Sequence, residues 1–315
     1  MTVPLPAIDQ SSQQLGAYRR VLLWFRNGLP TILALIFCFF WSSAFIANKI
    51  NLRYAPPLWN LTIRFIFAGT VVLAAAYWRG LAFPRNWQAY ARLGWFGFFN
   101  TALYMLFTLW GLAHVSAGTA AILASTNPLV LTLLGPLVLH ESLTRAKLAG
   151  VLLGFGGVCF VMLARLGTQD SLVGMLWIGA GVLSLIFATV LFKWYPPREP
   201  LIVANGVQLL VSGLVMLPLA LLDAPISEVH FGWPLLFGLG YVTIGVSIVG
   251  MAIWLWLLQR GEASKVSAYY FLTPIMGLAL STMLLGDRFG GRELLGLLAV
   301  VCGIILVNRP VQRAQ

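Results

Sequence analysis

Ten apolar stretches follow one another along this chain, each about as long as a membrane-spanning helix. An α-helix needs about 20 mostly apolar residues to cross a bilayer. The connections between the stretches are short and contain helix breakers such as Pro84 and Pro225. The stretches are residues 30–50, 58–78, 90–112, 118–139, 145–165, 172–194, 201–222, 233–258, 263–285 and 291–307. We therefore predict an all-α polytopic membrane protein with ten transmembrane helices.

The scarcity of charge supports a membrane location. Charged residues make up 9% of the chain and hydrophobic residues 60%, whereas soluble domains carry about 25% charged residues. A soluble fold of 315 residues could not cover its surface with so few charges. The net charge of +11 forms no basic, wettable face, so we expect the lipid bilayer and no nucleic acid as a partner.

The Lys and Arg residues divide unequally between the two predicted sides of the membrane. Five fall on one side: Lys49, Arg53, Arg165, Arg288 and Arg292. Fourteen fall on the side with both termini: Arg19, Arg20, Arg26, Arg79, Arg85, Arg92, Arg145, Lys147, Lys193, Arg198, Arg260, Lys265, Arg309 and Arg313. Because cytoplasmic connections are enriched in Lys and Arg, we predict that both termini are cytoplasmic. Residues 1–29 then form a cytoplasmic or interfacial segment, and residues 308–315 form a cytoplasmic tail.

The chain also contains an internal repeat. The sequence NPLVLTLLGPLVLHESLTRAKLAG at 127–150 is echoed by TPIMGLALSTMLLGDRFGGRELLG at 273–296, with a shift of 146 residues and no gap. The matched positions are Pro128 with Pro274, Glu141 with Asp287, Gly150 with Gly296 and Gly157 with Gly303. Upstream, with small changes of shift, they are Tyr54 with Trp194, Gly69 with Gly213 and Trp110 with Trp256. The repeat predicts two halves of five helices each, residues 30–165 and 172–307.

Five is an odd number, so the second half enters the membrane from the opposite face. The predicted fold is therefore a pair of inverted five-helix repeats. Many secondary transporters are built this way, with the substrate site near the midplane between the repeats. Pro128 and Pro274 should kink equivalent helices, and we expect them to act as hinges.

Several motifs resemble those of one transporter family. They are WSSAFIANK at 41–49, APPLWNLTIRF at 55–65, and the block Pro128…Glu141…Gly150 with its second copy. In these motifs, and over nearly its whole length, the chain resembles the EamA-type branch of the drug/metabolite transporter superfamily, most of all the bacterial aromatic amino acid exporters. The resemblance implies ten helices in two inverted halves and the export of solutes from a bacterial cytoplasm.

His140 and Glu141 look like the start of a zinc-protease motif, but the sequence does not complete it. That motif needs a second His four residues after the first, where Thr144 stands. We interpret Glu141 as an acid at the N-terminus of the following helix, with Asp287 as its counterpart. The sequence contains no HExxH, GxGD or GxSxG motif. We expect no enzyme activity, no metal and no cofactor, and an intramembrane enzyme is the disfavoured alternative.

Every Asp and Glu lies in a predicted connection or at a helix end. Proton-driven transporters commonly carry Asp, Glu or His within their helices. We therefore expect facilitated diffusion down a solute gradient, with a proton-coupled drug/metabolite antiporter as the alternative. A boundary shift that buries Glu141 or Asp287 would favour that alternative.

Polar and aromatic residues inside the apolar stretches are the candidates for a substrate cavity. A polar group in hydrocarbon is costly, so such side chains should face the bundle interior. The candidates are Trp41, Phe45 and Asn48 in the first stretch, Asn100, Tyr104 and Phe107 in the third, Ser125 in the fourth, and Tyr269 and Tyr270 in the ninth. Such a cavity is apolar with a few polar points, as small-ligand sites are. It suits a bulky, partly apolar zwitterion such as an aromatic amino acid.

Two cations complete the candidate site. Arg64 lies inside the second stretch, where it either binds carbonyl groups or attracts an anionic group of the substrate. Lys49 ends the first stretch and either snorkels to the interface or serves as a gate. The second half has Thr189 and Gln208 at the equivalent positions, so any cationic site is one-sided.

Together these features predict an alternating-access transporter in a bacterial inner membrane. We expect it to export small organic solutes, chiefly amino acids or related metabolites, as a monomer or weak dimer. The cavity should lie between helices 1, 3 and 4 and helices 6, 8 and 9, with helices 5 and 10 at the periphery. A carrier of phospholipids or nucleotide sugars is the second choice, because a nucleotide sugar needs more cavity cations than this sequence offers.

Overall fold

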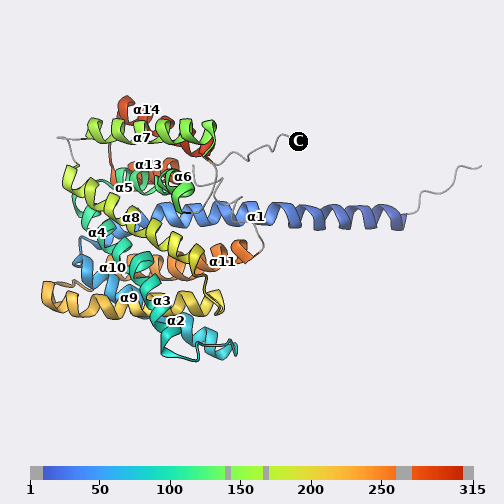
Figure 1. The fold of residues 1–315 in the computed structure, drawn as a ribbon, viewed down its shortest axis with the longest axis horizontal. Helices are drawn as coiled ribbons and strands as arrows, with labels where there is room; N and C mark the ends of the chain where they lie inside the picture. Colours follow the sequence, from blue (N-terminus) through green and yellow to red (C-terminus); the bar gives the residue numbers. More distant parts are fainter. Residues whose placement is uncertain (1–9, 139–142, 166–169, 260–271, 308–315) are drawn as a thin grey trace, which may run out of the picture.

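A computed structural model describes residues 10–138, 143–165, 170–259 and 272–307. Every regular element within these ranges is a helix (Figure 1). The α-helices are α1 (Gln10–Asn51), α2 (Pro57–Trp78), α3 (Trp87–Gly97), α4 (Tyr104–His114), α5 (Ala117–Ala124), α6 (Asn127–Val138), α7 (Arg145–Arg165), α8 (Leu172–Trp194), α9 (Leu201–Asp223), α10 (Trp233–Gly240), α11 (Met251–Gln259), α13 (Leu272–Leu285) and α14 (Gly291–Val307). Two π-helical segments, η1 (Phe98–Leu103) and η3 (Tyr241–Gly250), and a 3-10 turn, η2 (Ile226–Glu228), complete the series.

Eight helical segments within the described residues are long and apolar enough to cross a membrane. They are Gly28–Asn51, Pro57–Trp78, Trp87–His114, Ala117–Pro136, Arg145–Arg165, Leu172–Phe192, Leu201–Asp223 and Trp233–Trp254, and they overlap the first eight predicted stretches. Large apolar side chains such as Leu152 and Leu183 are exposed on their outer faces, where lipid can cover them. The chain is thus a multi-pass membrane protein. α13 is described over 14 residues and α14 over 17, so a total of ten spans stays a prediction.

α7 and α14 form one edge of the bundle (Figure 1), and glycines bring their backbones together. A Cβ atom on Gly157 would lie 2.6 Å from the carbonyl oxygen of Gly296, and one on Gly303 would lie 2.6 Å from that of Gly150. Close backbone approach through small residues is the usual way for helices to associate in a membrane. Since the earlier glycine of α7 meets the later glycine of α14, the two helices are antiparallel. They lie at the periphery, as predicted for the last helix of each half.

α2 and α9 pack in the same manner on the opposite edge of the bundle. A Cβ atom on Gly69 would lie 2.5 Å from the backbone nitrogen of Leu210. A Cβ atom on Gly213 would lie 2.7 Å from the backbone nitrogen of Ile66. The shift of 144 residues that relates Gly69 to Gly213 also relates Ile66 to Leu210, so the two contacts are equivalent. This pair of helices is antiparallel as well.

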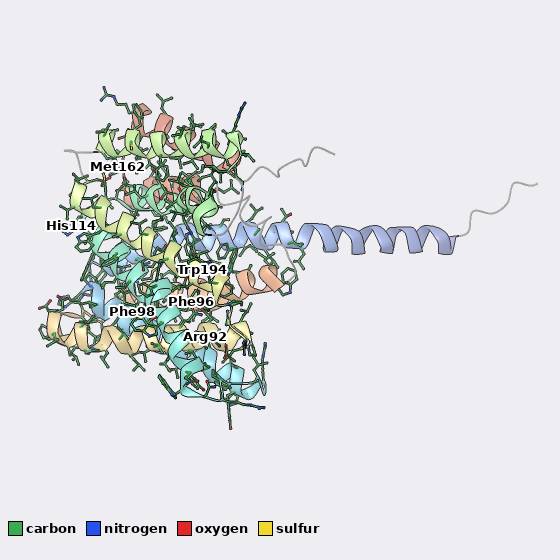
Figure 2. The ribbon with its side chains drawn as sticks, in the orientation of Figure 1. Arg92, Phe96, Phe98, His114, Met162 and Trp194 are labelled. Carbon is green, nitrogen blue, oxygen red and sulfur yellow. The ribbon has the colours of Figure 1, made fainter. Side chains whose placement is uncertain are left out.

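The helices run between two ends of the bundle, which we call the near end and the far end. The first residue of α1 and the last residue of α14 lie at the near end, and Asn51 and His114 lie at the far end. Figure 2 shows His114 at the far end, and Arg92 and Trp194 nearer the other. α1 projects well beyond the other helices at the near end (Figure 1). Its backbone is helical from Gln10 through Pro30, so the described part of the 1–29 segment continues the first span; its interfacial position stays a prediction.

Three interruptions break the regular α-helical pattern within the spans. The third span changes to π-helix at Phe98–Leu103 and the eighth at Tyr241–Gly250. The repeat shift of 146 residues carries 98–103 onto 244–249, inside the second π-helix. π-Helical turns often occur at functional sites.

The third interruption separates α5 from α6 at Ser125 and Thr126. Their hydroxyl groups donate to the carbonyl oxygens of Ile122 and Leu123, which satisfies the freed helix end. Pro128 is the second residue of α6 and Pro274 the third residue of α13. Pro128 therefore stands in the first turn of α6, where a missing N–H costs little. Their role as hinges stays a prediction.

Candidate substrate cavity

A small cavity lies between α1, α2, α4 and η3. Its wall includes four residues predicted from the sequence, Trp41, Phe45, Asn48 and Tyr104, together with Arg64. The remaining wall is formed by Ala44, Met105, Thr108 and Val246. The space between these side chains, its open mouth included, is about 290 Å³. α2 therefore replaces the predicted fourth helix in the wall, and the second half contributes a single lining residue.

Aromatic rings form one side of the cavity. The rings of Trp41 and Tyr104 are stacked, with centroids 6.3 Å apart and an angle of 8° between their planes. Phe37 lies one turn before Trp41, with its centroid 5.8 Å from that of Trp41. Phe45 is buried one turn further along α1. This wall can hold a flat or apolar part of a ligand.

Asn48 contributes a polar group to the same wall. Its side chain is 3% exposed, and its Oδ1 atom has no hydrogen-bond partner among the described residues. A buried amide oxygen without a partner costs free energy, and a buried polar group normally finds a partner in the protein, in water or in a ligand. Asn48 is therefore an acceptor without a protein partner among the described residues, in the wall of the cavity.

Arg64 contributes a positive charge. Its side chain is buried, and its Nε and Nη2 atoms donate to Ser247 Oγ at 3.2 and 3.1 Å. Nη1 lies 3.9 Å from Met105 Sδ, and the guanidinium carbon is 5.4 Å from the centroid of the Phe65 ring. Ser247 belongs to η3, so this contact joins α2 of the first half to the π-helix of the second. Ser247 could not have been found from the sequence, because only the fold brings it to Arg64.

Lys49 lies outside the cavity and caps a helix. Its Nζ atom donates to the carbonyl oxygens of Leu112 at 2.5 Å and Val115 at 2.6 Å, at the end of α4. A cation at a helix C-terminus satisfies unpaired carbonyl groups and interacts favourably with the helix dipole. In this structure Lys49 thus binds backbone rather than reaching an aqueous mouth.

Three other predicted cavity residues lie away from this wall. Asn100 donates through Nδ2 to Gln208 Oε1 at 3.4 Å. The ring of Phe107 stacks on Trp177 of α8 at 5.3 Å, and Ser125 bonds the backbone of its own helix. We expected Asn100, Tyr104 and Phe107 to share one face because we assumed an uninterrupted α-helix. The π-helix η1 changes the number of residues per turn between Asn100 and Tyr104, so the two side chains point in different directions. Four residues fall outside the described part of the chain: His140, Glu141, Tyr269 and Tyr270.

A buried ion pair at the far end was not anticipated from the sequence. Arg165 Nε lies 2.8 Å from Asp170 Oδ2, with the two side chains 3% and 0% exposed. Asp170 also accepts the backbone N–H of Ser116 at 2.7 Å and the hydroxyl of Thr119 at 2.5 Å. The linker between the halves is thereby fastened to the start of α5.

The same Arg165 also reaches the second half. Its Nη1 atom donates to the carbonyl oxygen of Arg288 at 2.8 Å and lies 4.0 Å from Glu293 Oε1. Its guanidinium carbon is 4.7 Å from the centroid of the Phe289 ring. The far end is therefore held by one cation between two acids. From the sequence, Arg165, at the end of the fifth stretch, was counted only among the five cations on one side of the membrane.

Asp287 behaves differently from its predicted role as an acid at the start of α14. It accepts a hydrogen bond from the Ser281 hydroxyl, whose oxygen in turn accepts the backbone N–H of Gly118 at 3.0 Å. The carboxylate of Glu293 takes the place at α14, accepting the backbone N–H of Gly290 at 2.9 Å. Asp287 thus belongs to the contact between α13 and α5.

Secondary transporters are helical membrane bundles with a substrate site between their halves, and the described helices with their small aromatic and polar cavity fit that class. The comparison with known families agrees. The sequence model of the EamA-like transporter family matches residues 29–163 and again residues 172–309. The chain belongs to this family and is a membrane transporter. The two matches also show that the family unit occurs twice in the chain.

Relatives in other organisms have transporter names. A protein of Synechocystis, named an uncharacterized transporter, is 28% identical over 306 residues that cover 91% of each chain. A probable amino-acid metabolite efflux pump of Salmonella typhimurium is 25% identical over 87% of this chain and 93% of its own. A crystal structure superposes with a TM-score of 0.64 at 21% identity, covering 89% of this chain and 96% of that one, which supports the fold alone.

Proposed function

We propose that this protein is an alternating-access exporter of amino acids, aromatic ones included, and related metabolites. The cavity carries the proposal, because it combines a stacked aromatic wall with one cation and one unpaired amide oxygen. The name of the Salmonella relative supports the substrate class. The protein works as a monomer or weak dimer in a bacterial inner membrane.

The proposed architecture is ten spans in two inverted halves, residues 30–165 and 172–307. The contacts of Gly150 with Gly303 and of Gly157 with Gly296 support it, because exchanging the halves converts one contact into the other. The antiparallel direction of α7 and α14 is what an axis in the membrane plane produces. The matching π-helical segments η1 and η3 support it as well.

The proposed orientation places the near end in the cytoplasm and the far end outside. The excess of Lys and Arg on the side of both termini supports this orientation. Single cysteines can test it in a chain whose own Cys38, Cys159 and Cys302 are replaced. A membrane-impermeant thiol reagent applied to intact cells should label a cysteine at Arg53 and leave one at Arg85 unlabelled. The opposite pattern would reverse the orientation.

The proposed mode of transport is facilitated diffusion. No Asp, Glu or His is among the residues that line the cavity in the described part of the chain. A proton carried with each solute molecule would need a titratable group that the solute or its neighbours can reach. Purified protein in liposomes filled with a pH-sensitive dye provides the test. Internal pH should stay constant during solute flux, and a stoichiometric pH change would establish proton coupling instead.

The substrate class is tested by flux of a panel of radiolabelled amino acids in proteoliposomes. Tyr104→Ala should raise the KM for aromatic amino acids about tenfold, because the stacked wall is lost. The matched control is Phe107→Ala, also in α4, whose ring packs on Trp177 instead. It should lower the thermal stability without changing the order of substrate preference. If no amino acid of the panel is transported, the proposed substrate class is wrong, although the fold is unaffected. If Tyr104→Ala leaves the substrate selectivity unchanged, Tyr104 does not belong to the site.

A further inference from the structure

We propose that the Arg64 guanidinium binds the carboxylate of the substrate. In the present conformation, the Ser247 hydroxyl accepts the hydrogen bonds that the carboxylate would accept. The inference rests on the proposed function and deepens it, because it defines the ligand as an α-amino acid by its charged groups. It also assigns to the contact between Arg64 and Ser247 a part in the conformational cycle.

The first support is the missing counter-charge of Arg64. A guanidinium has five N–H donors and carries its charge at any physiological pH. Within the described residues its donors reach one neutral hydroxyl, that of Ser247, and the thioether of Met105, and no carboxylate is paired with it. A buried cation is expensive unless an anion compensates it. Since Arg64 lines the cavity, an anionic group of a ligand can supply that compensation.

The second support is the Asn48 oxygen on the wall of the same cavity. This oxygen is buried, can only accept, and has no partner among the described residues. An ammonium group donates three N–H bonds and suits such an acceptor. A ligand whose carboxylate accepts from Arg64 and whose ammonium group donates to Asn48 is a zwitterion. The rings of Trp41 and Tyr104 then receive the apolar side chain.

The third support is the location of the contact between Arg64 and Ser247. It joins α2 of the first half to η3 of the second, across the boundary that alternating access must open. A carboxylate binds a guanidinium in a two-pronged geometry that a single hydroxyl cannot match. When the substrate takes the Arg64 donors, the link between α2 and η3 is released. Substrate binding thereby favours the conformation in which the halves have moved, as a ligand does when it binds one state better than another.

The experiment uses three probes of one shape on the purified full chain. L-phenylalanine has both charged groups, 3-phenylpropanoate has only the carboxylate, and phenethylamine has only the ammonium. Binding is measured as the shift in thermal unfolding midpoint over a concentration series, and flux is measured in proteoliposomes. The wild-type chain should bind L-phenylalanine most tightly. Arg64→Gln should weaken L-phenylalanine and 3-phenylpropanoate about tenfold or more and leave phenethylamine within about twofold.

Two controls separate recognition from structure. Arg79→Gln removes a cation from the exposed end of the same helix and should change none of the three affinities. Arg64→Lys keeps the charge but loses the two-pronged geometry, so it should recover part of the carboxylate affinity. Equal weakening of all three probes by Arg64→Gln would mean that Arg64 only holds the fold, and would overturn the proposal.

Ser247→Ala tests the exchange itself. With its competitor removed, the Arg64 guanidinium should bind both carboxylate probes more tightly than in the wild-type chain, with phenethylamine unchanged. Weaker carboxylate binding in this variant would contradict the exchange. If wild-type liposomes move no amino acid but carboxylates still bind through Arg64, the transport proposal fails and the recognition proposal survives. If amino acids move and Arg64→Gln discriminates nothing, the reverse holds.

Discussion

Between α7 and α14, equivalent positions of the two halves meet in matched pairs, Gly150 with Gly303 and Gly157 with Gly296. The cavity wall is unmatched. With the repeat shifts of 140 and 146 residues, Trp41, Asn48 and Tyr104 of the wall align with Gly181, Ala188 and Gly250. The halves thus share their packing surfaces and differ in the groups offered to a ligand.

The small residues of the second half have a packing role behind the wall. A Cβ atom on Gly181 would lie 3.0 Å from the Thr108 hydroxyl oxygen and 3.0 Å from the Tyr104 carbonyl oxygen. The glycine therefore lets α8 press against α4, which carries both residues. Matched interfaces can be exchanged between the halves during a conformational cycle. An unmatched cavity keeps one set of chemical groups for the ligand throughout that cycle.

The largest expected effect lies in the unmatched network at the far end. Asp170→Ala leaves the buried Arg165 without its closest acid and the N–H of Ser116 without its acceptor. Breaking one side of a buried ion pair costs about 3–5 kcal/mol. Chemical denaturation in detergent should show that loss in the free energy of unfolding. Asp170→Asn is the matched control, since it keeps an oxygen acceptor and should lose less; wild-type stability in Asp170→Ala would show that this end does not anchor the halves.

The matched interface predicts two equal effects. Gly157→Ala and Gly303→Ala each place a methyl group within 2.6 Å of a backbone oxygen of the partner helix. Overpacking of this kind costs about 1–3 kcal/mol. Gly156→Ala is the control, because no atom lies within 4 Å of its added Cβ. Thermal unfolding should show similar losses of stability in Gly157→Ala and Gly303→Ala and no loss in Gly156→Ala. Clearly unequal losses at Gly157 and Gly303 would break the equivalence of the two halves.

Helix positions could be predicted well from the sequence because apolar length and flanking charges are local properties. The ranges 145–165, 172–194 and 291–307 coincide with α7, α8 and α14. The repeat aligned Gly150 with Gly296 and Gly157 with Gly303, but only the fold shows that these glycines meet across α7 and α14. The π-helices and the break at 125–126 could not be predicted, because they depend on how neighbouring helices crowd the backbone.

The site was predictable only in part for the same reason. Trp41, Phe45 and Asn48 lie along one uninterrupted α-helical face, and all three line the cavity. Asn100 lies inside the π-helix η1, and its side chain contacts Gln208 rather than the cavity. Asp170 looked like an ordinary loop acid, because only the fold brings donors from α7 and from the start of α5 around it.

A smaller loss of stability is expected at Lys49 of the first half, whose equivalent in the second half is the neutral Thr189. Lys49→Met removes the donor that caps the carbonyl oxygens of Leu112 and Val115. A charge at a partly buried helix terminus contributes up to about 2 kcal/mol, so we expect a loss of about 1–2 kcal/mol in unfolding free energy. The equivalent change in the second half is Thr189→Val. Among the described residues, its hydroxyl donates to the Leu185 carbonyl oxygen of its own helix and to no other group, so the loss should be within about 0.5 kcal/mol. Comparable losses would mean that Lys49 does not act as a cap.

The smallest effect is expected at the near end, where Arg92 lies 3.2 Å from Glu199. This pair resembles the far-end pair in its chemistry but not in its burial, because the Arg92 side chain is 39% exposed. Ion pairs in contact with water contribute about 0–1 kcal/mol and weaken with salt. Glu199→Gln should therefore lower stability by less than about 1 kcal/mol, and less still at high salt. Asp170→Asn should keep its larger effect at both salt concentrations, since a buried pair is poorly screened. A salt-independent loss at Glu199 as large as that at Asp170 would remove the distinction between the two ends.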